Sequence, residues 1–62
     1  MPLIQVKVLE DELTDGVTED LIAKLTDALC EATREELRAV TWVMVEGMAA
    51  SAWGAAGKPL GD

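Results

Sequence analysis

The chain opens with Pro2-Leu3-Ile4-Gln5-Val6-Lys7-Val8-Leu9, a stretch that predicts a β-strand over residues 2–9. Leu, Ile and Val dominate it, and its two polar residues, Gln5 and Lys7, alternate outward. This pattern is typical of a strand in a sheet with one well-buried face. Proline is tolerated at the first residue of an edge strand, so Pro2 is compatible with the strand that follows it.

Pro2 is also the residue that offers the most obvious catalytic group. The chain contains no His, no Tyr and a single Cys, which excludes a histidine-based triad, a zinc site of two Cys and two His, and a thiol-disulfide pair. If Met1 is cleaved, Pro2 has a free secondary amine, and an α-amino group has a pKa of about 7.7–8.0 in model peptides. Such a base titrates nearer to neutrality than any lysine. No metal and no cofactor is expected; the alternative is that Pro2 simply begins an edge strand.

A loop and an amphipathic helix are expected next. Residues 10–16 contain turn formers, with Thr14 or Asp15 able to cap the amides of the first helical turn. Apolar residues then recur at spacings of three, four and seven, which predicts a helix over 17–32 that packs one stripe on the sheet. The stripe consists of Val17, Leu21, Ile22, Leu25, Ala28, Leu29 and Ala32. Cys30 lies among them and is expected to be a small packed residue, because no base is placed to activate its thiol.

The second half of the chain predicts a further turn, a strand and a hairpin. Thr33-Arg34-Glu35-Glu36 has the form of a capping box for one short turn. Residues 40–46 are β-branched almost throughout and predict a second strand, parallel to the first by a right-handed crossover. The Gly- and Ala-rich tail, residues 47–60, suits a small hairpin whose Trp53 docks on a neighbouring subunit. We therefore expect one domain over residues 1–62, of α/β (α+β) class: a single β-α-β unit with parallel strands and a short C-terminal hairpin.

Size and charge limit what this domain does. A chain of 62 residues buries only about 60% of the surface that its unfolded form exposes. It lacks the residues for a disulfide or zinc staple, so oligomerisation is the expected route to a sufficient core. The formal net charge of -7 disfavours nucleic acid and anionic membrane surfaces as partners. The sequence shows no targeting signal and no apolar run of about 20 residues, so we expect a cytoplasmic location.

The order of these parts resembles the 4-oxalocrotonate tautomerase family of the tautomerase superfamily. The shared features are the amino-terminal proline, the Leu9-Glu10 end of the first strand, the Leu21-Ile22 pair in the helix, and an aromatic-Gly-X-X-Gly hairpin at Trp53-Gly54-Ala55-Ala56-Gly57. The resemblance implies that dimers form a four-stranded sheet with two helices on one face, and that three dimers make a hexamer. It also implies that Pro2 is the general base in a keto-enol proton transfer on a small enol or 2-oxo acid, and that Trp53 is a wall of the pocket.

The sequence departs from this family at the positions that bind the substrate carboxylate. The resemblance implies one arginine shortly after the first strand, where this chain has Glu12, or Leu13 if the loop carries an extra residue. A second arginine is implied at the second strand, where this chain has Thr41 or Trp42, depending on the placement of a gap. Arginine binds a carboxylate through two charge-assisted hydrogen bonds, whereas Glu12 repels it. A dicarboxylate is therefore expected to bind poorly.

Arg34 and Arg38 remain as substitutes for the missing arginines. Arg38 lies only a few residues before the second strand, and a neighbouring subunit could present it. The alternative is structural, since Arg34 favours a helix C-terminus and Arg38 a solvated turn.

Two functional classes stay open. The first is a proline-based tautomerase or related isomerase with atypical or weak carboxylate recognition, in which Pro2 is the base. Its candidate substrate-binding residues are Trp53, Trp42, Thr41, Glu12 and Arg38. The second is a non-catalytic or structural subunit of a mixed hexamer, whose other chain provides the arginines. A retained Met1 favours the second class, because the Pro2 nitrogen is then an amide nitrogen without a basic lone pair.

Overall fold

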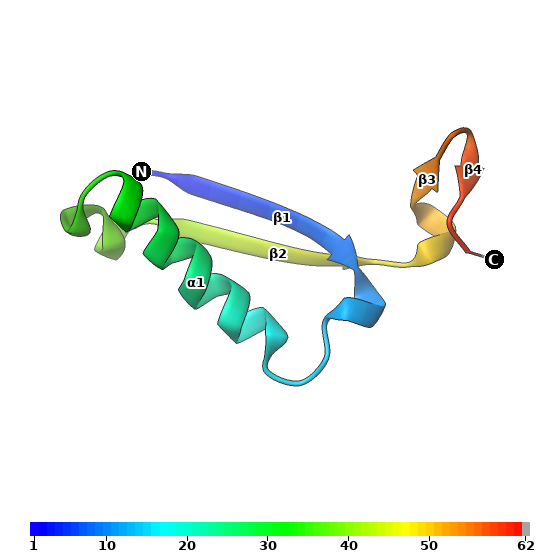
Figure 1. Cartoon of the computed structure of the whole chain (residues 1–62), viewed down its shortest axis with the longest axis horizontal. Helices are drawn as coiled ribbons and strands as arrows, with labels where there is room; N and C mark the ends of the chain where they lie inside the picture. The colour runs from blue at the N-terminus through cyan, green and yellow to red at the C-terminus, as the bar shows by residue number, and fades with distance from the viewer. Residues whose placement is uncertain (62) are drawn as a thin grey trace.

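The computed structural model describes residues 1–61 and contains a β-α-β unit followed by a small hairpin (Figure 1). Its strands and helix are β1 (Leu3–Leu9), α1 (Val17–Ala32), β2 (Trp42–Met48), β3 (Gly54–Ala55) and β4 (Lys58–Pro59). Short 3-10 helices lie between them: η1 (Glu10–Glu12), η2 (Glu35–Val40) and η3 (Ala50–Ala52). The expected fold class is therefore confirmed, and the hairpin lies beyond the end of β2.

β1 and β2 pair in parallel along their whole length, from Leu3 opposite Trp42 to Leu9 opposite Met48. The connection through α1 thus produces the parallel pair that the sequence predicted. Pro2 precedes the strand instead of opening it. Its carbonyl oxygen nevertheless accepts a hydrogen bond from the Trp42 backbone N–H at 2.9 Å, which ties the proline to the sheet.

The second strand occupies residues 42–48 instead of the expected 40–46. Val40 and Thr41 are β-branched, which favours a strand, but the chain before them winds into η2, which ends at Val40. The Thr41 hydroxyl donates a hydrogen bond to the Leu37 carbonyl oxygen at 2.7 Å. Such a local bond competes with sheet pairing, so Thr41 stays in the turn and the strand begins after it.

α1 spans the expected residues 17–32. Two side-chain caps predicted from the sequence, one for the start of α1 and one for the short turn after it, are wrong. Gly16 precedes the helix with φ 82°, in the left-handed region that glycine adopts without strain. The helix start therefore has no side-chain cap from Thr14 or Asp15. At the other end, the Thr33 hydroxyl donates back to a carbonyl oxygen of the last helical turn at 2.6 Å. The Thr33 hydroxyl is thus directed back to α1, and η2 has Arg34 as its N-cap and begins without a side-chain cap.

The face of α1 that packs on the sheet is narrower than expected. Its half-buried apolar residues recur every four positions: Val17, Leu21, Leu25 and Leu29. Ile22, Ala28 and Ala32 are exposed and lie outside this face. Cys30 has 5% of its surface exposed, as expected for a packed thiol. Within residues 1–61, no helix is long and apolar enough to cross a bilayer.

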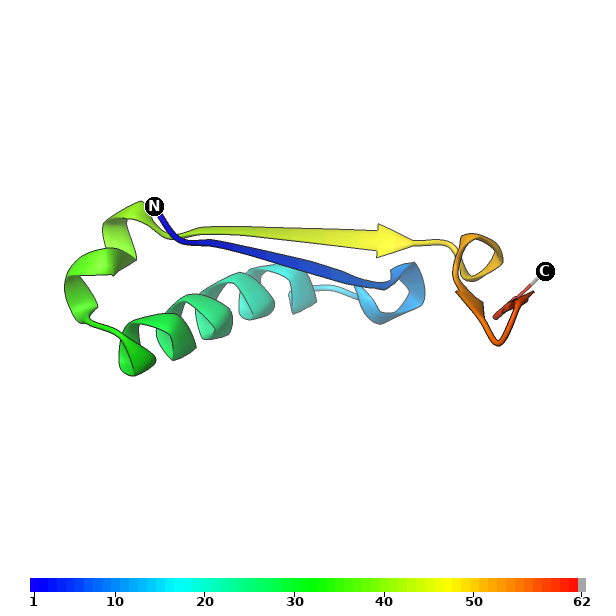
Figure 2. The ribbon, with the colours of Figure 1, turned by 90° about the horizontal axis from the view of Figure 1, so that it is seen from above.

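The two faces of the β1-β2 sheet differ in cover, because successive side chains of a strand point to opposite faces. α1 lies along one face of the sheet (Figure 2). Among the half-buried side chains of the two strands, we assign to the covered face Ile4, Val6, Val8, Val43 and Val45. The opposite face carries the exposed side chains of Leu3, Gln5, Lys7, Trp42, Met44 and Glu46. We name these six residues the open face.

The C-terminal hairpin is confirmed. β3 and β4 pair antiparallel, and the residues between them, Ala56 and Gly57, have φ angles of 54° and 82°. Two consecutive residues with positive φ are typical of the two-residue turns that match the twist of a hairpin. The Leu60 N–H donates to the Trp53 carbonyl oxygen at 2.8 Å, which closes the base of the hairpin beside the tryptophan.

Gly47 sets how closely η1 approaches β2. A Cβ atom at this position would lie 2.8 Å from Leu13 Cδ1 and 3.2 Å from Glu10 Cα. Overpacking of this kind costs about 1–3 kcal/mol, and the lower entropy of an unfolded alanine chain offsets about 0.4–1 kcal/mol of it. We therefore expect Gly47→Ala to lower the free energy of unfolding by roughly 1 kcal/mol in urea denaturation.

The matched control is Gly54→Ala. A Cβ atom there meets only the Lys58 carbonyl oxygen at 3.5 Å, an ordinary van der Waals contact. This variant should be at least as stable as the parent chain. Equal stability of Gly47→Ala and the parent would show that η1 moves away from β2 without cost.

Candidate active site

The amino-terminal end of the sheet forms a small apolar hollow around Pro2. Met1, Pro2, Leu3 and Trp42 line it, and its volume is about 220 Å³. We name these four residues the amino-terminal half-site. The hydrogen bond from the Trp42 N–H to the Pro2 carbonyl oxygen holds the proline beside the tryptophan. None of the four residues has a charged side chain, so the hollow suits an apolar part of a ligand.

Trp42 and Thr41 have different relations to this hollow, although both were candidates for the same family position. Trp42 lines it and is 58% exposed, so its indole is free to contact a ligand. The Thr41 hydroxyl donates its proton to the Leu37 carbonyl oxygen and closes the end of η2. The structure therefore gives Trp42 a place in the half-site and gives Thr41 a role in the turn before it.

Arg38 binds carboxylates of its own chain. Its Nη1 lies 2.7 Å from Asp27 Oδ1, and its Nε and Nη2 donate to the two carboxylate oxygens of Glu35 at 2.7 and 3.2 Å. The hydrogen bonds to Glu35 and then Asp27 raise the pKa of Arg38, and Arg38 in turn lowers the pKa of the Glu35 carboxyl. Three guanidinium nitrogens thus bind carboxylates of the same chain: two hold Glu35 within η2, and Nη1 joins η2 to Asp27 of α1. This arrangement supports the structural alternative for Arg38 over substrate binding.

Trp53 lines a second hollow at the other end of the sheet. Its lining residues are Lys7, Met48, Ala52, Trp53 and Gly54, and its volume is about 300 Å³. We name them the carboxy-terminal half-site. Glu12 lies in η1, the segment that directly follows the carboxyl end of β1. The residues that the sequence placed in one pocket therefore divide between the two ends of the chain.

Pro2 and Trp53 of the same chain cannot contact the same small molecule. β1 has seven residues, which span about 23 Å at 3.3 Å per residue. The amino terminus and the hairpin lie at opposite ends of the molecule (Figure 1). The two half-sites can form a single pocket only if each comes from a different chain.

Lys7 is the residue of the carboxy-terminal half-site that sequence reasoning missed as a candidate. Its outward position in the strand was predicted, but that alternation does not encode that the chain after β2 places Trp53 in the same hollow as Lys7. Its ammonium nitrogen lies 3.8 Å from Glu46 Oε1, and both side chains are largely exposed. Lys7 thus places a positive charge in the half-site that contains Trp53, and the Glu46 carboxylate lies close to this charge.

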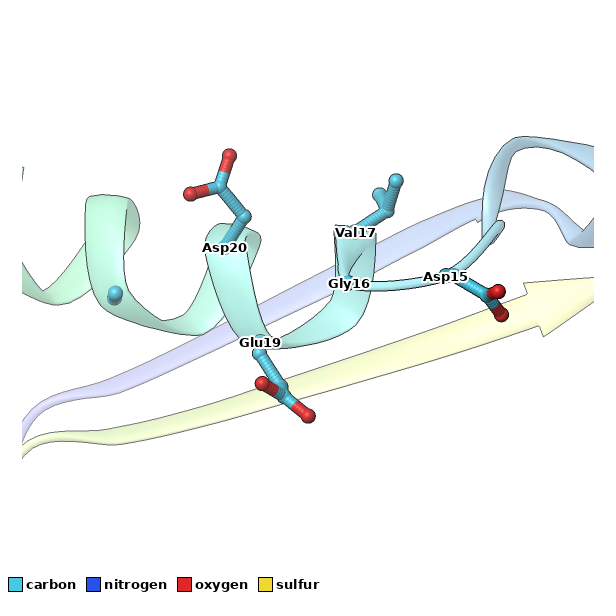
Figure 3. A pocket seen from close by; sticks show the side chains of 6 residues that line it. Asp15, Gly16, Val17, Glu19 and Asp20 are labelled. Atoms are coloured by element: carbon cyan, nitrogen blue, oxygen red, sulfur yellow. The ribbon is translucent and has the colours of Figure 1, made fainter.

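A larger hollow of about 430 Å³ lies at the start of α1 but lacks the geometry of a binding site. It is lined by Asp15, Gly16, Val17, Glu19, Asp20 and Ala23. The carboxylates of Asp15, Glu19 and Asp20 point in different directions (Figure 3). Asp20 also pairs with Lys24 at 2.8 Å. Among residues 1–61, no group of three or more His, Cys, Asp or Glu side chains is placed to hold a metal ion.

The β-α-β unit, with a proline before its first strand and a tryptophan before its hairpin, is the arrangement expected of a tautomerase-like protein. The chain belongs to the Tautomerase family, because the family model described as "Tautomerase enzyme" matches residues 2–62. Its fold is similar to that of the crystal structure of DmpI from Helicobacter pylori, with a TM-score of 0.83, 18% sequence identity, and 95% of each chain covered. No curated protein sequence matches the chain significantly. The resemblance inferred from the sequence is therefore confirmed at the level of family and fold.

The pairing of Arg38 with Glu35 should make stability depend on pH in the acid range. A carboxyl whose pKa is lowered in the folded state contributes stability above its unfolded pKa, and this contribution is lost as the pH falls through the folded pKa. We expect Arg38→Gln to lower the urea midpoint at pH 7, and the difference from the parent to vanish as the pH falls below about 4.

The control for this prediction is Arg34→Gln, which removes the same charge four residues earlier. Within residues 1–61, Arg34 forms none of the ion pairs described here. The urea midpoint of Arg34→Gln should equal that of the parent at each pH. A difference for Arg38→Gln that persists at pH 3 would show that the guanidinium does not act mainly through the Glu35 pair and would assign its effect to Asp27 or to packing.

Proposed function

We propose that this protein is a proline-based tautomerase that catalyses keto-enol proton transfer on a small enol or 2-oxo acid-like substrate. The observation that carries the proposal is the position of Pro2, at the head of β1 in an apolar hollow beside Trp42. Membership of the Tautomerase family supports this class of reaction. The finer assignment, to chemistry of the 4-oxalocrotonate tautomerase type, rests on the hollow and the order of motifs.

In this proposal the neutral amine of Pro2 accepts a proton from the substrate, and the resulting ammonium returns a proton to a carbon atom. The reaction requires removal of Met1, because only then does the Pro2 nitrogen have a basic lone pair. Apolar walls support the base role, since a poorly solvated amine disfavours its charged form. Trp42 of the same chain supplies one such wall.

A neighbouring chain completes the pocket by providing the carboxy-terminal half-site with Trp53. The separation of Pro2 and Trp53 within one chain favours this arrangement. We propose that the chains form dimers with four-stranded sheets and that three dimers make a hexamer, as the family resemblance implies. The partner is either a second copy or a related chain.

The substrate in this proposal is less anionic than a dicarboxylate. The amino-terminal half-site contains no cationic side chain, and Arg38 already binds two carboxylates of its own chain. The same lack of a free guanidinium favours the second candidate function, a non-catalytic subunit of a mixed hexamer. The two candidates differ in one measurable property: only the tautomerase needs a free Pro2 nitrogen.

We expect protein without Met1, verified by intact mass, to ketonise a phenylpyruvate-like enol weakly. Pro2→Ala should reduce this rate at least ~10-fold, because a positioned general base contributes about 100- to 10,000-fold and a primary amine replaces it only in part. The measurement is the decay of enol absorbance at pH 7.

A chain that keeps Met1 is the control for this assay. It contains Pro2, but the Pro2 nitrogen is an amide nitrogen and not a free amine. This chain should therefore be as slow as Pro2→Ala or slower. Equal rates in all three proteins would assign the base to another group. No activity in the parent, with Met1 removed, would favour the non-catalytic subunit.

Glu12→Arg tests whether η1 of a neighbouring chain borders the pocket. An added guanidinium there should attract an anionic substrate and favour the neutral form of the amine. A charge-assisted hydrogen bond contributes about 1.5–3 kcal/mol, so we expect kcat/KM for a 2-hydroxydienoate to rise about 10- to 100-fold, mainly through KM. High salt should reduce the gain.

The matched control is Glu31→Arg, which makes the same charge change on an exposed position of α1. It should leave kcat/KM nearly unchanged. If Glu12→Arg also leaves the rate and its pH profile unchanged, η1 does not border the active site.

A further inference from the structure

Lys7 is the cationic side chain of the carboxy-terminal half-site. The other residues that line this hollow, Met48, Ala52, Trp53 and Gly54, are uncharged. The amino-terminal half-site and the hollow at the start of α1 have no basic side chain in their linings. A fourth hollow, of about 310 Å³, also has Lys7 in its lining. Of these four hollows, all formed by residues 1–61, only the two bordered by Lys7 therefore offer a positive charge to a ligand.

The ammonium group of Lys7 is held more loosely than the other paired cations of the chain. Lys24 lies 2.8 Å from Asp20, and two nitrogens of Arg38 lie 2.7 Å from carboxylate oxygens. In contrast, the Lys7 nitrogen is 3.8 Å from Glu46 Oε1, which is too long for a hydrogen bond. The Lys7 side chain is 64% exposed. Its N–H donors are thus accessible to a ligand that enters the hollow.

Trp53 gives the same hollow an apolar wall and a further donor. The residue is half-buried, and within residues 1–61 its indole N–H takes part in none of the side-chain hydrogen bonds. An indole nitrogen and an ammonium can each donate but not accept. The volume of about 300 Å³ is at the lower end of the range for small-molecule sites. This combination of a cation, N–H donors and an apolar wall suits a small anion that carries an apolar group.

Glu46 restricts the negative charge that such a ligand can carry. It is directly opposite Lys7 in the strand register, and its side chain is 63% exposed. A ligand carboxylate that reaches the Lys7 ammonium therefore comes close to the Glu46 carboxylate and competes with it. A second negative charge on the ligand would add to this repulsion. One carboxylate is the charge that a single loosely paired ammonium can balance.

We propose that Lys7 binds the carboxylate of a monocarboxylate ligand in the carboxy-terminal half-site, with the apolar part of the ligand against Trp53. The substrate class is then a 2-oxo acid, or its enol, that has one carboxylate and an aryl or alkyl group. This substrate class rests on the proposed function, whereas binding of the anion does not require the Pro2 amine. An ammonium acts as a point charge and lacks the two parallel hydrogen bonds of a guanidinium, so recognition of the carboxylate is weak.

The test compares two probes of the same shape and different charge. 3-Phenylpropionate has a carboxylate and a phenyl ring, and 3-phenylpropanamide replaces the carboxylate with a neutral amide. Both are titrated into the protein without Met1 and followed by NMR through the Trp53 indole N–H signal, which a Trp42→Phe variant distinguishes from the signal of Trp42. We expect the parent to bind the carboxylate more tightly than the amide. Lys7→Gln should raise the Kd of the carboxylate about 5-fold, the upper range for an exposed charge pair, and leave that of the amide unchanged.

Two further variants separate ligand binding from a structural role of the ion pair. Glu46→Gln removes the competing carboxylate, so it should lower the Kd of 3-phenylpropionate, opposite in sign to Lys7→Gln. Lys7→Arg keeps the charge and should retain the preference for the carboxylate over the amide. The matched control is Lys24→Gln, which removes the same charge on α1 at a residue that lines none of the four hollows. It should bind both probes like the parent. Far-UV circular dichroism verifies the fold of each variant, and the Glu46→Gln and Lys7→Arg results decide the matter if Lys7→Gln unfolds.

Three results would overturn the inference: equal Kd values of the parent for the two probes, an unchanged Kd for folded Lys7→Gln, or weaker binding by Glu46→Gln. The enol assay distinguishes this failure from failure of the proposed function. If both proposals hold, Lys7→Gln should raise KM about 5-fold and keep kcat, because the carboxylate contact is equal in the ground and transition states. Activity that depends on Pro2 but not on Lys7 would refute only the anion site. Lys7-dependent binding by an inactive protein would refute only the enzyme.

Discussion

The parallel pairing of β1 with β2 is the interaction on which the rest of the structure depends. It places Leu3 opposite Trp42, so that the Trp42 N–H reaches the Pro2 carbonyl oxygen and the amino-terminal half-site forms. The same register directs alternate side chains to α1 and to the open face. A slip of one residue would exchange the two faces, because the side-chain period of a strand is two. The position of Pro2, the cover by α1 and the composition of the open face all follow from this one register.

The periodicity of apolar residues predicted the strand and the helix that each bury one face. It did not predict the caps and boundaries of elements, which depend on local backbone hydrogen bonds. The alternation in β1 and the helical spacing in α1 were sufficient for both elements. The start of α1 at Val17 was predicted, but its cap was not, because Gly16 makes the turn through its own backbone, without the side-chain cap that Thr14 or Asp15 would supply. The start of β2 was mispredicted because strand propensity is high at Val40, while the end of η2 decides where pairing can begin.

The residues of the candidate site were easier to predict than their arrangement. Pro2 and Trp42 lie together because the β-α-β topology brings the starts of two parallel strands side by side. The contact of Arg38 with Asp27, 11 residues earlier, depends on how η2 folds back against α1, which no local pattern contains. Trp53 lies between η3 and β3, beyond the end of β2, and its expected contact with a neighbouring subunit stays a prediction. The order of residues in one sequence does not give the symmetry that relates two chains. A pocket shared between chains would depend on that symmetry.

Trp42 belongs to both the amino-terminal half-site and the open face, so the proposed assembly and the proposed chemistry involve the same side chain. In an isolated chain Trp42 is 58% exposed, although it lines the hollow around Pro2. In the proposed oligomer, a neighbouring chain that completes the pocket would remove water from the indole and from the hollow beside it. Exclusion of water disfavours a charged amine and strengthens the electrostatic interactions inside a site. If the proposed oligomer covers Trp42, the same contact that buries this side chain would favour the neutral form of the Pro2 amine, so a chain of 62 residues would need no separate element to shield its base.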